Sequence, residues 1–373
     1  MFLFNRDPGE NFIGREKEID YITQHIRMSQ NVLVTGPRRM GKTTLAKEII
    51  NRLKERNFFT AYLEILPVSS INHLSSEIVG AVLENLNLRN EFYEMKSEAN
   101  LSSIDPELKI IVDDYDFLLG FRGKSVDNYE LLGNCLDFIE RFSVRHKKRM
   151  VCVFDEFGDI KKLDDGRLVE LFKSRIRKHI NTSYFFTGSY ESVMSSLFEE
   201  AQSPFNRFAT KLRIGEIDEQ DFMTFYERQF GYYHIPFPDK LVIRILDLTR
   251  GHPFYTQLAL QEIIIYHLAN EKIPDFDVLI RKMIHAEKDY LEKSWEEIAT
   301  SKQNIKTILA VTKGVNGVYS SLRNSNVNIY RSLKMLVGNG TLTVNPDKTY
   351  RMSDPLLNFW IKQNVHRQDI RVT

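Results

Sequence analysis

Residues 36–44 decide the fold of this chain and read Gly36-Pro37-Arg38-Arg39-Met40-Gly41-Lys42-Thr43-Thr44. The apolar run Val32–Val34 precedes this stretch, and the amphipathic segment Leu45–Leu53 follows it. A strand, a glycine-rich loop and a helix in this order are typical of a phosphate-binding loop. A glycine-rich turn with a surface lysine is the alternative, but the strand and the helix on either side favour the loop. The stretch therefore predicts an α/β core that binds a nucleoside triphosphate.

The residue types of this loop suit phosphate binding. Gly36 and Gly41 allow a backbone path that turns successive N–H groups into one cavity, and the following helix adds the positive end of its dipole. Lys42 can reach the outer phosphates, and the Thr43 hydroxyl can ligate Mg²⁺. We therefore expect ATP or ADP with Mg²⁺ to be held by Gly36, Pro37, Arg38, Arg39, Met40, Gly41, Lys42, Thr43 and Thr44.

A second motif ends the apolar run Met150–Phe154, which reads as a strand buried on both faces of a parallel sheet. Asp155 and Glu156 follow this run, at the strand end where open α/β sheets bind ligands. Asp155 is predicted to hold Mg²⁺ together with Thr43. Glu156 is predicted to polarise the water that attacks the γ-phosphate.

Three further residues are candidates for catalysis. The predicted strand Ser183–Phe186 ends at Thr187 and Ser189, whose hydroxyls can sense the γ-phosphate or orient water. Capping of the next helix explains Ser189 equally well. Arg207 could stabilise the transition state in its own subunit or in a neighbouring one, or be an ordinary surface arginine.

Composition excludes several classes of protein. The 373 residues are 42% hydrophobic and 27% charged with a net charge of +1, which are ordinary values for a water-soluble protein of two or three domains. Two cysteines exclude a disulfide scaffold, so we expect a cytoplasmic setting. We expect no signal peptide and no membrane span. The acidic residues Asp113, Asp114 and Asp116 lack the glycine of a calcium loop and predict a solvated turn.

The rest of the chain predicts helices and then a hairpin. Four helices are expected over 218–232, 239–249, 253–270 and 276–299, with Gly251 and Pro253 forming the turn between two of them. Helices over 305–312, 318–323 and 328–337 then precede a hairpin of strands 341–344 and 349–352, which is the outline of a winged helix-turn-helix. Its third helix carries Arg331 and Lys334, a thin basic face, so packing or partner binding is at least as good an interpretation as DNA reading.

With these pieces in place, the chain resembles the archaeal-type ATPases of the STAND class, which are relatives of the AAA+ proteins. The motifs that carry the resemblance are Phe12–Glu18, Gly36–Thr43, Val153–Phe157, Thr187–Ser189, Ser203–Phe205 with Arg207, Gly251–Tyr255, and Asp354-Pro355 with Phe359-Trp360. The resemblance implies a P-loop ATPase domain over 1–217, an all-α lid domain over 218–300 and a winged helix-turn-helix domain over 301–373. It also implies that Gly14 and Arg15 lie beside the adenine and that Pro253 packs near the base.

Two functions follow as expectations. The first is a slow ATP hydrolase that acts as a nucleotide-dependent switch, with a protein partner or DNA at the winged helix and oligomer formation left open. The second is a DNA-binding initiator or loader that resembles the origin-recognition ATPases. A scaffold that does not hydrolyse ATP is a third, less favoured interpretation.

Overall fold

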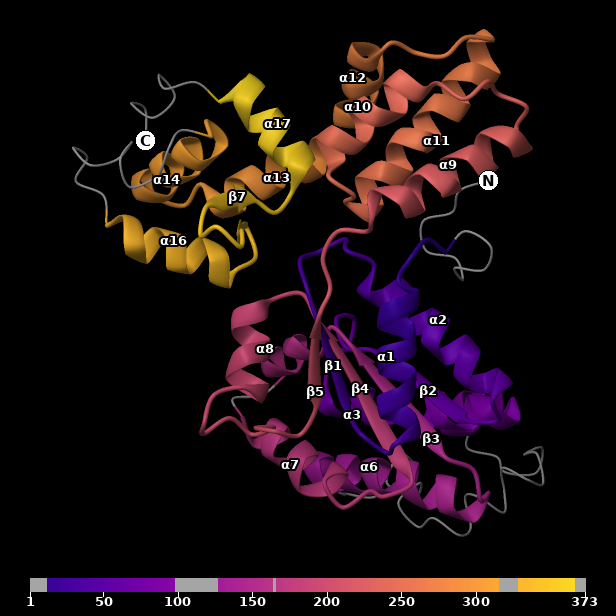
Figure 1. Cartoon of the computed structure of the whole chain (residues 1–373). Helices are drawn as coiled ribbons and strands as arrows, with labels where there is room; N and C mark the ends of the chain where they lie inside the picture. The colour runs from indigo at the N-terminus through magenta and orange to yellow at the C-terminus, as the bar shows by residue number, and fades with distance from the viewer. Residues whose placement is uncertain (1–11, 98–126, 164–165, 315–327, 366–373) are drawn as a thin grey trace.

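A five-stranded parallel sheet forms the centre of the N-terminal part (Figure 1). The computed structural model describes residues 12–97, 127–163, 166–314 and 328–365. The strands stand in the order β2-β3-β4-β1-β5. Their bounds are β1 Val32–Thr35, β2 Phe59–Glu64, β3 Met150–Asp155, β4 Thr182–Gly188 and β5 Thr210–Arg213. This sheet confirms the predicted α/β core.

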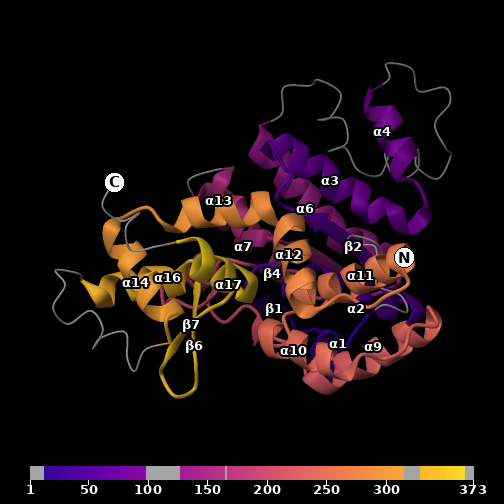
Figure 2. The same cartoon turned by 90° about the horizontal axis from the view of Figure 1, so that it is seen from above.

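Helices cover both faces of this sheet, which is why β3 and β4 are buried along their whole length. Figure 2 shows the two layers with the sheet between them. One layer contains α1 (Glu16–Arg27) and α2 (Lys42–Glu55), and its core includes Ile22 and Leu45. The other layer contains α3 (Ile71–Leu83), η2 (Glu84–Leu86), α4 (Arg89–Ser97), α6 (Asn128–Arg145), η4 (Phe157–Lys162), α7 (Arg167–Ile176) and α8 (Glu191–Phe198).

The strand order brings the predicted motifs to one edge. β4 pairs with β1 on one side and with β3 on the other, and all three strands are parallel. Their C-terminal ends therefore lie side by side. The loop after β1, the carboxylates after β3 and the hydroxyls after β4 meet at this edge of the sheet.

The next part of the chain is helical, with one correction to the predicted bounds. Its helices are α9 (Glu219–Tyr232), α10 (Asp239–Thr249), α11 (Pro253–Asn270), α12 (Phe276–Ala286) and α13 (Lys288–Ile298). The single helix predicted over 276–299 is two helices, because the chain leaves helical geometry at Glu287 (φ −106°, ψ 12°). No glycine or proline marks this break in the sequence.

The C-terminal part contains α14 (Lys302–Thr312), α16 (Ile329–Gly338), the antiparallel hairpin β6 (Leu342–Val344) and β7 (Tyr350–Met352), and α17 (Pro355–Asn364). The sequence reading missed α17, although Asp354 caps it and Pro355 occupies its first turn. One cluster of buried apolar side chains runs from α9 to α17, so these two parts share a core. Trp295 and Trp360 both pack against this cluster.

Two predicted features lie outside the described residues: the acidic turn with Asp113, Asp114 and Asp116, and the helix over 318–323. None of the helices in the described ranges has the length and apolar character that a membrane span requires.

Candidate functional site

The loop after β1 turns into α2 through left-handed backbone geometry. Gly41 caps α2 with φ 81°, a conformation that is costly for any residue with a Cβ. Arg39, two residues earlier, also has a positive φ of 63°. This sequence of backbone angles places the loop over the first turn of α2, so the positive end of the helix dipole points at the cavity beneath it.

Lys42 lies inside the loop. Its Nζ donates to the carbonyl oxygens of Gly36 (3.0 Å) and Pro37 (2.9 Å) and lies 3.9 Å from Oε1 of Glu156. The side chain is 4% exposed. Burial lowers the pKa of the Lys42 ammonium, and the Glu156 and Asp155 carboxylates oppose that shift. The ammonium thus bridges the phosphate loop and the carboxylates after β3.

Asp155 is the centre of a hydroxyl cluster. Its Oδ2 accepts hydrogen bonds from Thr43 Oγ1 (2.7 Å) and from the Tyr62 hydroxyl (2.6 Å), and its Oδ1 accepts one from Thr187 Oγ1. The structure thus brings Thr43, Asp155 and Thr187 together, as the sequence motifs require. Tyr62 was missed, because its place beside Asp155 follows from the pairing of β2 with β3 and no sequence motif contains it.

Glu156 is held by the end of β4. Its Oε2 accepts a hydrogen bond from the Ser189 backbone N–H (3.0 Å), and its Oε1 accepts one from the Ser189 hydroxyl. The backbone N–H of Glu156 donates to Thr187 Oγ1 at 3.0 Å. Thr187 therefore holds the main chain of Glu156, and Ser189 holds its carboxylate. Ser189 does not cap α8 through its side chain; Tyr190 occupies that position.

The segment before α1 joins the loop to the helical part. Arg15 is buried, and its guanidinium donates to the carbonyls of Met40 (3.3 Å) and Gly215. Gly14 lies against the side chains of Ile217 and Asp221. This segment therefore lies where the loop, β5 and α9 meet.

The side chains of the two loop arginines pair with residues of other elements. Arg38 is exposed and pairs with the hydroxyl of Tyr190, 4.8 Å from that ring's centroid. Arg39 reaches the helical part and pairs with Glu287. Both guanidinium groups therefore have partners outside the loop.

Pro253 and Arg207 occupy very different places. Pro253 is buried at the start of α11, in a turn whose Gly251 carbonyl accepts a hydrogen bond from the Ile217 backbone N–H (2.9 Å). Ile217 therefore touches both this turn and Gly14. Arg207 is exposed and precedes β5, whose first residue pairs with Val32 at the start of β1. It lies at the edge of the sheet opposite the loop.

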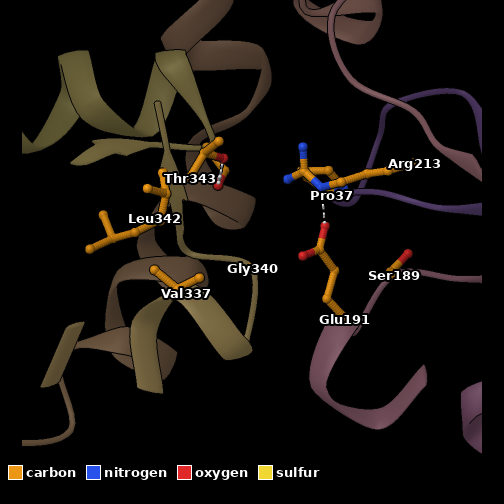
Figure 3. A pocket seen from close by; sticks show the side chains of 10 residues that line it. Pro37, Ser189, Glu191, Arg213, Val337, Gly340, Leu342 and Thr343 are labelled. Atoms are coloured by element: carbon orange, nitrogen blue, oxygen red, sulfur yellow. Dashed lines mark hydrogen bonds and ion pairs between the residues drawn. The ribbon is translucent and has the colours of Figure 1, made fainter. Parts of the chain in front are cut away.

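A pocket of about 300 Å³ separates the loop from the C-terminal hairpin (Figure 3). Pro37 and Ser189 line it from the sheet, and Leu342 and Thr343 face them from the hairpin. In the described residues no three His, Cys, Asp or Glu side chains are grouped to hold a metal ion.

Solved structures share this architecture. The chain matches the Walker-type ATPase PABY2304 of Pyrococcus abyssi with a TM-score of 0.71 at 17% identity, over 97% of this chain and 99% of that one. It matches the Aeropyrum pernix ORC2 protein, solved as ADPNP and ADP complexes, with a TM-score of 0.60 at 16% identity over 96% and 97%. The ORC1 protein of the same organism, solved in complex with DNA, gives 0.51 at 12% over 95% and 93%. At these identities the likeness establishes the fold alone.

A comparison with curated proteins returned no match. The model of one protein family, described as an ATPase domain predominantly from Archaea, matches residues 12–258. This range contains the phosphate loop, the carboxylates after β3 and the hydroxyls after β4. Because the match covers well over half of the chain, the protein belongs to this archaeal ATPase family and is a P-loop ATP hydrolase.

Proposed function

We propose that this ATPase is a nucleotide-dependent switch of the STAND class, with an ATPase domain over 1–217, a lid over 218–300 and a winged helix over 301–373. The observation that carries the proposal is the shared core of the lid and the C-terminal part, which faces the phosphate loop as one unit (Figure 1). A nucleotide bound at the loop changes the contacts that this unit makes. The two nucleotide states then favour different placements of the unit.

The chemistry rests on the cluster at the sheet edge. We assign the phosphate contacts to the loop backbone and Lys42 and the proton acceptor to Glu156. Thr187 holds the main chain of Glu156, and Ser189 orients its carboxylate. Only a neighbouring subunit's Arg207 can reach the γ-phosphate, because the residue lies at the far edge of its own sheet. We assign the surroundings of the base to Gly14, Arg15 and Pro253, which gather around Ile217 and the loop.

Mg²⁺ fits the residues present. The Thr43 hydroxyl and the Asp155 carboxylate lie 2.7 Å apart, and hydroxyl and carboxylate oxygens are the protein ligands that Mg²⁺ accepts, usually with waters and phosphate oxygens completing the set. When bound, Mg²⁺ neutralises charge on the β- and γ-phosphates. Thr43 and Asp155 would hold it, and Tyr62 would keep Asp155 oriented.

Nucleotide binding measured by calorimetry tests the first step. Lys42→Ala removes the buried ammonium, and we expect ATP affinity to fall by at least about tenfold. Lys54→Ala is the matched control, because Lys54 is exposed near the end of the same helix and far from the loop. Lys42→Ala binding ATP as tightly as wild type would refute the proposal. A switch further requires that small-angle scattering differ between the ADP-bound protein and ATP-bound Glu156→Gln.

A DNA-binding initiator is the second candidate, and exposed Arg331 and Lys334 on α16 favour it. The same helix exposes Tyr330 and Met335, which suit a protein contact better than a phosphate backbone. Duplex binding that weakens with salt and is lost in Arg331→Ala with Lys334→Ala would favour the initiator. Absence of duplex binding at low salt would favour a protein partner.

A further inference from the structure

Arg39 belongs to the phosphate loop by sequence but to the helical part by contact. Its guanidinium carbon lies 3.5 Å from the ring centroid of Tyr290 and 4.2 Å from that of Phe254, and the group pairs with the Glu287 carboxylate. We call Phe254, Glu287 and Tyr290 the arginine cage. The Arg39 side chain is 26% exposed and that of Glu287 is 12% exposed, so the contact is largely shielded from water.

The cage suits arginine in particular. A planar guanidinium can stack on two aromatic faces while its edge donates to a carboxylate, and a lysine ammonium cannot do both. Burial acts to lower the pKa of Arg39, but the hydrogen bond with Glu287 and the nearby tyrosines outweigh it and leave the pKa raised. The guanidinium is therefore charged wherever the fold is intact, and the pair with Glu287 persists.

The three cage residues come from the helical part of the chain. Phe254 lies in the first turn of α11, Tyr290 lies in the first turn of α13, and Glu287 is the residue at which α12 and α13 separate. The break between α12 and α13 thus directs the Glu287 carboxylate towards the phosphate loop, and no sequence motif predicts it.

A second contact extends the cage to the C-terminal part. Tyr255, next to Phe254, donates its hydroxyl to Oδ2 of Asp354 at 2.6 Å. The other oxygen of Asp354 caps α17 by accepting from the Leu357 backbone N–H at 2.8 Å. A continuous set of contacts therefore runs from the phosphate loop through α11 to α17.

We infer that Arg39 is a positioning residue that retains the nucleotide: its side chain clamps the phosphate loop to α11 and α13 instead of touching phosphate. The inference rests on the proposed nucleotide site at the loop. While Arg39 occupies the cage, the loop backbone cannot move away from a bound diphosphate independently of the lid. Release of ADP then requires the arginine cage to open. The rate of ADP dissociation therefore depends on Phe254, Glu287 and Tyr290, although none of them contacts a phosphate.

Stopped-flow dissociation of a fluorescent ADP analogue from the full chain tests this. We expect Arg39→Met and Glu287→Gln each to raise the dissociation rate by at least about tenfold, and Arg39→Lys to restore little of the loss. The double variant should release ADP no faster than the faster single variant, since both remove the same contact. Glu292→Gln is the matched control, because its exposed carboxylate lies on the same helix as Tyr290 and pairs there with Lys288 (3.9 Å).

The outcomes separate cleanly. Tryptophan fluorescence during urea unfolding verifies that each variant is folded, since Trp295 lies on α13 itself. Wild-type dissociation rates in folded Arg39→Met and Glu287→Gln would overturn the inference while leaving the nucleotide site intact. Loss of ADP binding in Arg39→Met with wild-type kinetics in Glu287→Gln would also overturn it, because Arg39 would then act on the nucleotide directly. Absence of ADP binding by the wild type would instead refute the proposed function.

Discussion

At the sheet edge, the sequence predicts which residues meet but not the backbone conformation that holds them. Lys42, Thr43 and Asp155 converge because one loop and two strand ends meet, and this meeting follows from the sequence motifs. The left-handed backbone of Arg39 and Glu156 does not follow from their residue types, since neither is a glycine or an asparagine. Such conformations cost free energy and persist where the surroundings impose them, which is common at functional sites.

His252 provides a prediction at this scale. It is 2% exposed, its Nδ1 has no hydrogen-bond partner among the described residues, and the centroid of its ring lies 4.7 Å from that of Tyr255. Burial lowers its pKa to about 3, helped by the positive charges of Arg39 and Arg250. The unfolded chain therefore binds a proton on this residue below about pH 6.5, whereas the folded chain does not until about pH 3. The unfolding free energy therefore has its full value above about pH 6.5, the pKa of histidine in the unfolded chain, and it falls as the pH decreases from there to about pH 3.

We expect protonation of His252 in the unfolded chain to lower the unfolding free energy by about 2 kcal/mol as the pH falls from about 7 to about 5. Urea unfolding followed by tryptophan fluorescence measures it, since both tryptophans pack on the cluster that surrounds this turn. His252→Phe keeps an aromatic ring against Tyr255 and cannot be protonated, so its stability should depend less on pH by that amount. Equal pH dependence of the two proteins would contradict the prediction.

At the scale of elements, periodicity located most helices and strands but could not locate contacts between them. The strands around the loop and β3 were predictable, because apolar runs bounded by the two motifs are buried on both faces. The division at Glu287 was not predictable, because the residues on both sides continue one helical pattern. The place of Tyr62 beside Asp155 depends on strand order, which a single strand does not encode.

The turn from α10 to α11 provides the prediction for elements. Gly251 has φ 70°, and a Cβ on it would overlap the backbone oxygen of Ile217. We expect Gly251→Ala to lower the unfolding free energy by about 2–4 kcal/mol, the sum of the left-handed penalty and the displaced backbone. Gly231→Ala is the control, because Gly231 is helical and, apart from its chain neighbours and its own helix backbone, no described atom lies within 4 Å of the added Cβ. Tryptophan-monitored urea unfolding distinguishes them, and similar stability of both variants would mean that the turn yields without strain.

At the scale of the whole molecule, the sheet with its helices meets a second unit built on one core. Besides the arginine cage, two polar contacts between described residues join the units. Arg351 pairs with Glu216 (2.5 Å), and the Ile217 N–H donates to the Gly251 carbonyl (2.9 Å). Because the interface has few polar contacts, these can be exchanged for others when the two units move relative to each other. A switch between two placements of the units needs such an interface.

Arg207 carries the prediction for assembly. It is exposed at the edge of the sheet where β1 begins, whereas the phosphate loop follows the end of β1. The four residues of β1 alone separate the two edges by about 10 Å, so Arg207 lies at the edge of the sheet opposite its own site. If it stabilises a transition state, it does so in a neighbouring copy. We therefore expect ATP turnover per chain to rise with protein concentration and Arg207→Ala to lower it by at least about tenfold.

Mixing two inactive variants decides between this role and that of a surface arginine. Arg207→Ala keeps an intact loop, and Lys42→Ala keeps an intact Arg207, so a mixed assembly contains some sites with both groups. We expect the mixture to hydrolyse ATP faster than the sum of the two variants measured separately. Turnover that is independent of concentration, together with a mixture no faster than that sum, would mean that each chain completes its own site and that Arg207 lies outside it.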